Sequence, residues 1–159
     1  LDISFDKGTN ILYGDNAQGK TNILEAIFVA ATTKSHKGSK DKDIINFAKE
    51  EAHIRTYLEK EGVETRVDMH LRKSKSKGIA IDGQKIKKAA DLLGLCNVVF
   101  FSTEDLSIIK EGPAERRNFV DMELCQLDNF YLYNLNNYNK IVNQRNSLLK
   151  ELYFQPLCL

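Results

Sequence analysis

Eight residues near the start of the chain, GDNAQGKT from Gly14 to Thr21, have the spacing G-x-x-x-x-G-K-[ST] of a phosphate-binding loop. Its two glycines let backbone N–H groups approach an anion and adopt dihedral angles that other residues resist. Lys20 can reach the β- and γ-phosphate oxygens of a nucleotide, and the Thr21 hydroxyl is a natural Mg²⁺ ligand. The pattern predicts a nucleoside triphosphate site. The candidate binding residues are Gly14, Asp15, Asn16, Ala17, Gln18, Gly19, Lys20, Thr21 and Asn22, with Thr21 as the candidate metal ligand.

Such a loop needs a strand before it and a helix after it. NILY, residues 10–13, is a short apolar run that predicts a buried strand. TNILEAIFVAA, residues 21–31, has apolar residues at helical spacing and no Pro or Gly, which predicts a helix buried on more than one side. The alternative is a glycine-containing turn with a chance lysine, and both flanks disfavour it.

Composition sets the class of protein. With 159 residues, 42% of them hydrophobic and 28% charged, the chain is expected to be an ordinary globular protein of one domain or slightly more. The net charge of +1 indicates no class of partner. Three cysteines without metal-ligand spacing favour reduced thiols, and no run is long enough to span a bilayer, so we expect a cytoplasmic protein. Both ends look cut, which predicts a fragment of a longer protein.

The middle of the chain predicts antiparallel hairpins. Residues 32–43 are polar and basic, and we expect a mobile loop there. Apolar and polar residues alternate with a period of two on either side of KEG, which predicts two paired strands. Asp82-Gly83 is a strong signal for a second hairpin. AADLLG predicts a short helix that Gly94 closes, and NVVFF, residues 97–101, predicts another buried strand.

The character changes at Pro113, which suits the first turn of a helix, and no strand is predicted from there to about Leu152. One helix packed on a core and a two-helix arm remain equally open. In either case, we expect residues 1–112 to belong to one lobe and residues 113–159 to begin a helical lobe. A heptad-like apolar stripe runs through the second part, at Tyr131, Leu135, Tyr138, Val142, Arg145, Leu149 and Leu152.

Hydrolysis of a triphosphate requires an acidic residue at the end of a second buried strand. The only candidates are Glu104 and Asp105, which follow the strand predicted at residues 97–101 at a distance of three and four residues. We expect the acidic strand to lie beyond Leu159 instead. The three histidines are scattered, and we assign them no metal or acid–base role.

Four segments in order, GDNAQGKTNILEAI, KSHKGSKDKDII, NVVFFSTEDLSIIKEGPAERRNFVD and YNKIVNQRNSLLK, resemble the RecF family of bacterial recombination mediators. Asn16 and Asn22 also fit the broader group of SMC-like, ABC-type ATPase heads. The resemblance implies an α/β fold, a P-loop ABC-type ATPase lobe whose mixed sheet carries antiparallel hairpins, followed by the start of a helical lobe.

The same resemblance implies ATP and Mg²⁺ as cofactors and ATP-dependent DNA binding in recombinational repair and replication restart. RecR, gapped DNA and a second copy of the protein are the implied partners. Weak hydrolysis is expected only in the complete ATP-bridged dimer, and essentially none in the fragment. The alternatives are another SMC-like ATPase head, a small-molecule kinase of the P-loop class and a non-catalytic interaction lobe.

A basic stretch supplies the candidate DNA contacts. Between residues 72 and 88 seven basic residues stand against one acid, Asp82, and the alternation places several of them on a hairpin edge. A solvated hairpin tip is an equally good interpretation of such a run. The candidate residues are Arg72, Lys73, Lys75, Lys77, Lys85, Lys87 and Lys88.

Overall fold

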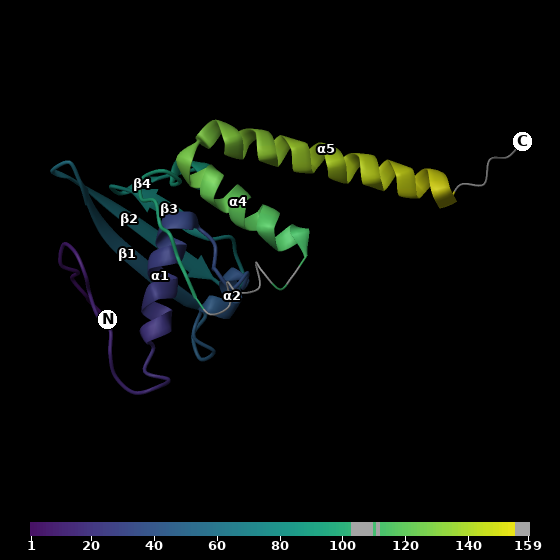
Figure 1. Ribbon diagram of the computed structural model, residues 1–159. Coiled ribbons are helices and arrows are strands. Elements are labelled where there is room, and N and C mark those ends of the chain that lie inside the picture. Colours follow the sequence, from purple (N-terminus) through teal and green to yellow (C-terminus); the bar gives the residue numbers. More distant parts are fainter. Residues whose placement is uncertain (103–109, 111, 155–159) are drawn as a thin grey trace, which may run out of the picture. The chain divides into compact units, whose positions relative to one another are not determined.

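The computed structural model of the protein describes residues 1–102, 110 and 112–154. The chain forms two compact units, Leu1–Lys85 and Ile86–Leu159. Two helices and a four-stranded sheet build the first unit, and two long helices dominate the second (Figure 1). Helices and strands are thus combined as the predicted α/β class requires. Among the described residues, no helix combines the length and the apolar character that crossing a membrane requires.

The helix after the glycine-rich loop is α1, Lys20–Thr32. Five consecutive residues at its C-terminal end, from Phe28 to Thr32, are buried, and they span more than one turn. This end of the helix is therefore buried on more than one side, as the sequence predicts. Thr33 ends the helix in a left-handed conformation (φ +65°), and its N–H donates to the Val29 carbonyl at 2.8 Å.

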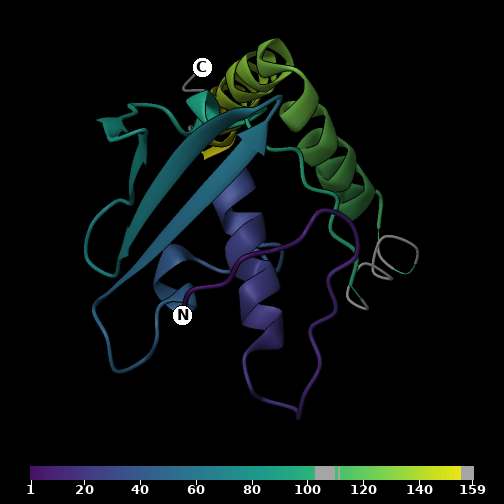
Figure 2. The same cartoon turned by 90° about the vertical axis from the view of Figure 1, so that its left-hand side faces the viewer.

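The sheet consists of β1 (Glu51–Lys60), β2 (Val63–Arg72), β3 (Gly78–Ile81) and β4 (Gln84–Lys85), paired antiparallel in that order. The predicted alternation is confirmed in β2, where Val67, Met69 and Leu71 are at most 1% exposed. Helix α1 packs against β1, and the short helix α2 (Asp41–Ile44) packs against β2 (Figure 2). The core of this unit lies between these helices and one face of the sheet.

The second predicted hairpin is also confirmed. Asp82 and Gly83 both have positive φ angles, +49° and +82°, as a two-residue turn of type I′ requires. The Arg66 N–H donates to the Asp82 carboxylate at 2.8 Å, and the Asp82 N–H donates to the Arg66 carbonyl at the same distance. The turn is therefore attached to the middle of β2.

Two predicted strands are wrong in the described fold. Residues 10–13 and 97–101 form no strand, and every second apolar side chain faces solvent: Ile11 is 77% exposed, Tyr13 89%, and Val99 and Phe101 82% each. A short apolar run becomes a buried strand only where neighbouring strands pair with its backbone. The four described strands pair with one another instead, so all described pairs are antiparallel.

The second unit contains a 3₁₀ turn at Ala89–Asp91 and the helices α4 (Pro113–Leu127) and α5 (Asn129–Phe154). Helix α4 begins at Pro113, as predicted, and the two helices favour an arm over a single packed helix. The Tyr131 hydroxyl of α5 donates to the Asp121 carboxylate of α4, and this hydrogen bond raises the pKa of Tyr131. The distal part of the predicted stripe is largely exposed at Tyr138, Leu149 and Leu152.

Candidate nucleotide-binding site

The loop before α1 has the backbone that its glycines allow. Gly14 and Gly19 have φ angles of +141° and +89°, and between them Ala17 lies in the left-handed region at +64°. Side chains rarely tolerate the first two conformations, so glycine at these two positions has a steric reason. These turns lead the chain directly into Lys20, the first residue of α1.

Lys20 closes the loop. Its ammonium donates to the Gly14 carbonyl at 2.8 Å and to the Asp15 carbonyl at 2.5 Å, so the positive charge lies at the centre of the loop. The surrounding residues form an open cavity of about 220 Å³. Its lining consists of Asn16, Ala17, Gln18, Gly19, Lys20, Thr21 and Asn22. The structure therefore brings the predicted binding residues together at one place.

The start of α1 adds to the positive character of this cavity. The first N–H groups of a helix have no partner within it, and the helix dipole is positive at this end. No acidic residue lies in the first turn to oppose an anion. Thr21, which follows Lys20 in the sequence, is exposed at this site. The site can thus bind an anion such as a phosphate group.

The acidic residues that the sequence offers for hydrolysis are not part of this loop. Glu104 and Asp105 lie outside the described residues. Within the part of the chain that the structure describes, no three His, Cys, Asp or Glu side chains are grouped to hold a metal ion. Thr21 is therefore the only one of the predicted metal and acid candidates that can be placed.

The seven predicted DNA contacts lie in different local surroundings. Arg72 donates to the Ser76 carbonyl at 3.0 Å, and Lys73 to the Phe47 carbonyl at the same distance. Lys75 and Lys85 are exposed. Lys87 and Lys88 belong to the second unit.

Lys77 differs clearly from the exposed lysines of this group. Its side chain is only 21% exposed, and its ammonium donates to the Thr33 carbonyl and, at 2.8 Å, to the Asp41 carboxylate. Lys77 is thus committed to contacts inside the unit. These contacts make a direct contact of Lys77 with DNA less favourable, and its predicted DNA contact stays a prediction.

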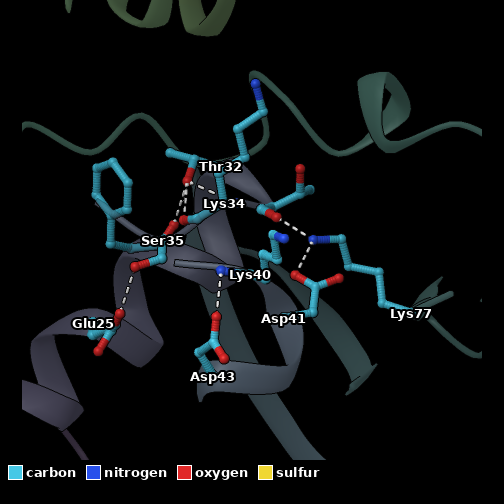
Figure 3. Close-up of polar contacts among 10 residues, drawn as sticks. Glu25, Thr32, Lys34, Ser35, Lys40, Asp41, Asp43 and Lys77 are labelled. Carbon is cyan, nitrogen blue, oxygen red and sulfur yellow. Dashed lines mark hydrogen bonds and ion pairs between the residues drawn. The ribbon is translucent and has the colours of Figure 1, made fainter. Parts of the chain in front are cut away.

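The segment between α1 and α2 differs from the mobile loop expected at residues 32–43. Thr32, Thr33 and Ser35 are at most 6% exposed. The Ser35 hydroxyl donates to the Glu25 carboxylate of α1, and the Lys40 N–H donates to Asp43 (Figure 3). Composition suggested a solvated loop because lysines dominate it, whereas its small hydroxyl residues make the contacts that hold it. Thr32 and Thr33, at the end of the predicted helix, were the signal in the sequence that could have predicted an ordered segment.

The outward face of the first hairpin carries a cluster that the sequence did not reveal. Strand register places His53 opposite His70, and their rings stack with centroids 5.4 Å apart. Arg55 and Arg66 both bind the Asp68 carboxylate, through Nε at 2.6 and 2.9 Å. The hydrogen bond from Arg55 is the main reason that the pKa of Asp68 is lowered. The period-two alternation assigns polar residues to one face of each strand, but the strand register is needed to pair them.

Comparison with known proteins bears directly on this site. The family described as an AAA domain matches residues 1–155. The DNA replication and repair protein RecF of Agathobacter rectalis is 65% identical over 156 residues, which cover 98% of this chain and 43% of that protein. RecF of Lachnoclostridium phytofermentans is 65% identical over 159 residues, 100% of this chain and 44% of that protein. The chain spans less than half the length of these relatives.

Solved structures agree. The recombination mediator protein RecF with ATP, of the RecFOR pathway, superimposes with a TM-score of 0.90 at 35% identity, covering 99% of this chain and 42% of that one. An SMC ATPase reaches a TM-score of 0.56 at 22% identity over 76% of this chain and 87% of that one, a likeness of fold alone. The predicted ABC-type ATPase fold and the resemblance to RecF are confirmed. The chain belongs to the AAA domain family, and within it the similarity is to RecF proteins.

Proposed function

We propose that this chain is the ATP-binding part of a recombinational repair protein. The observation that carries the proposal is the loop of Gly14 to Thr21, whose turns, central lysine and helix N-terminus form a cavity suited to phosphate. RecF structures that contain ATP have the same fold over nearly the whole chain. A P-loop kinase also binds ATP through such a loop, so it is the second observation that favours a RecF-like protein over a small-molecule kinase.

Each residue of the loop has a proposed role. The backbone N–H groups from Asn16 to Asn22 surround the β- and γ-phosphates, and Lys20 exchanges its carbonyl contacts in part for phosphate oxygens. Mg²⁺ would be held by the Thr21 hydroxyl together with phosphate oxygens. Bound Mg²⁺ supplies neutralisation of phosphate charge.

Hydrolysis depends on groups that this loop does not contain. The loop positions phosphate, but phosphoryl transfer also needs an acidic residue and a positioned water. We therefore propose that turnover is weak and belongs to a complete homodimer. We further propose that residues 1–112 form part of the ATPase lobe and that residues 113–159 begin a helical lobe, because α4 begins at Pro113 and no strand follows in the described residues.

DNA is the proposed macromolecular ligand, RecR the proposed protein partner, and the cytoplasm the proposed location. The first two proposals follow from similarity to proteins named for DNA replication and repair and for the RecFOR pathway. Lys75, between β2 and β3, and Lys85, in β4, are exposed and suited to contact phosphates, and Arg72 and Lys73 precede Lys75 in the chain. Lys87 and Lys88 are proposed contacts of the second unit.

The test is the dependence of DNA affinity on ATP in the full-length protein. Fluorescence anisotropy with a labelled gapped duplex should show tighter binding with ATP than without it. Lys20→Ala should remove this gain, whereas Lys60→Ala, which removes an exposed lysine of β1, should preserve it. An unchanged gain in Lys20→Ala, or no effect of ATP in the parent protein, would contradict the proposal.

A further inference from the structure

Four lysines project from a segment that the fold holds in place. The segment from Thr33 to Lys42, here called the α1–α2 segment, leaves the end of α1 through the left-handed Thr33. Ser35 is 6% exposed, and its hydroxyl both donates to Glu25 and accepts the Lys37 N–H at 3.2 Å. Gly38 turns the chain at φ +67°, and its N–H donates to the Ser35 carbonyl at 3.1 Å. These hydrogen bonds fix the backbone from which the exposed lysine side chains project.

Lys77, from the connection between β2 and β3, braces both ends of this segment (Figure 3). It binds the Thr33 carbonyl at the start and the Asp41 carboxylate near the end. The Thr33 carbonyl follows the C-terminal end of α1, where the helix dipole is negative, so an ammonium group is favoured there. Because Lys77 and Asp41 are 21% and 33% exposed, water and salt screen this pair less than a surface pair.

The exposed charged side chains of the α1–α2 segment are all positive. The four lysines at the surface, Lys34, Lys37, Lys40 and Lys42, are exposed, and none has a carboxylate within 4.0 Å among the described residues. The one acid of the segment, Asp41, pairs with Lys77, and Asp43, which follows the segment, accepts the Lys40 N–H at 3.2 Å. A charged surface whose acids are already neutralised or bound favours an external anion.

We propose that the α1–α2 segment binds the phosphate backbone of DNA and that Lys77 is a positioning residue that holds it. The inference rests on the proposed function and adds phosphate contacts to those proposed for Lys75 and Lys85. Lysines are point charges suited to phosphate contact without base readout. A segment ordered in advance loses less conformational entropy on binding, which strengthens a contact made by flexible side chains.

The first test is a salt titration of affinity for duplex DNA, with ATP present, in the full-length protein. The variant Lys34→Gln/Lys37→Gln/Lys40→Gln should weaken binding to all sequences alike. It should flatten the slope of log affinity against log salt by up to about 2.7, roughly 0.9 for each lost contact. A matched control, Lys49→Gln/Lys60→Gln/Lys140→Gln, removes the same charge from other exposed positions and should leave the slope within about 0.9 of the parent.

The second test separates positioning from contact. Lys77→Met removes both brace contacts and should weaken DNA binding and accelerate amide hydrogen exchange from Thr33 to Gly38, and Lys77→Arg should restore much of both. In the triple glutamine background Lys77→Met should have no further effect on DNA affinity, because the side chains that it positions are gone. An equal loss in both backgrounds would refute the positioning role.

The remaining outcomes distinguish the two proposals. If the parent protein binds DNA and the triple variant matches it in slope and affinity, the inference is wrong while the proposed function stands. If the parent protein does not bind DNA at all, both are wrong. Calorimetry with ATP serves to identify the source of the phosphate: the triple variant should bind ATP as the parent does, and a loss of ATP affinity would show that these lysines contact the nucleotide instead.

Discussion

Gln126 should stabilise the segment from Asn97 to Phe101 through its amide group alone. The side chain is 4% exposed, its oxygen accepts the Val98 N–H at 2.8 Å, and its NH₂ group donates to the Val98 carbonyl at 3.2 Å. A neighbouring β-strand would satisfy the N–H and the carbonyl of Val98 in the same way. With about 1 kcal/mol for each hydrogen bond, Gln126→Leu should lower the free energy of unfolding by about 2 kcal/mol.

The assay is amide hydrogen exchange combined with thermal unfolding. A loss of about 2 kcal/mol should speed exchange at Val98 roughly 30-fold and lower Tm by about 4–8 °C for a chain of this size. Gln144→Leu, at an exposed position of α5, is the matched control and should change neither quantity appreciably. A Gln126→Leu variant with unchanged protection at Val98 would refute the reasoning.

Two further predictions concern the first unit. Gly83→Ala should lower the free energy of unfolding by about 1–2 kcal/mol, because an alanine at φ +82° is strained. The added Cβ would also lie 3.2 Å from Arg66 Nη2. Gly78→Ala, with an ordinary backbone and its nearest contact at 3.8 Å, should be close to neutral in the same denaturant titration. Because the pKa of Asp68 is lowered from 3.8 in the folded state, its ionised form stabilises the fold above that pH, and this contribution is lost as the pH falls through the lowered pKa. Melting curves of Asp68→Asn should therefore change less with pH below 3.8 than those of the parent, and identical acid profiles would contradict this.

The elements predicted correctly are those whose cause is local. The helix after Gly19, the strand alternation around Val67 and the Asp82-Gly83 turn all follow from periodicity or backbone conformation within a few residues. The nucleotide-binding loop is local in the same sense, because its spacing alone brings Lys20 back to the Gly14 carbonyl.

The features that the sequence could not predict depend on distant partners. Residues 10–13 and 97–101 have strand composition, but a strand needs a neighbour, and composition does not say whether one is present. Lys77 looked like its neighbours in the basic run, and only the fold shows that Asp41, 36 residues away, neutralises it. The stacked pair of His53 and His70 likewise depends on strand register, which no local pattern reveals.

The central claim is that the loop from Gly14 to Thr21 binds the phosphates of ATP through Lys20. Isothermal titration calorimetry of the full-length protein with ATP and Mg²⁺ tests it most directly, with Lys20→Ala compared against Lys60→Ala. Circular dichroism of each variant confirms that α1 and the sheet remain folded. The account predicts that Lys20→Ala abolishes measurable ATP binding while Lys60→Ala binds as the parent does. A folded Lys20→Ala variant with the parent's ATP affinity would contradict it.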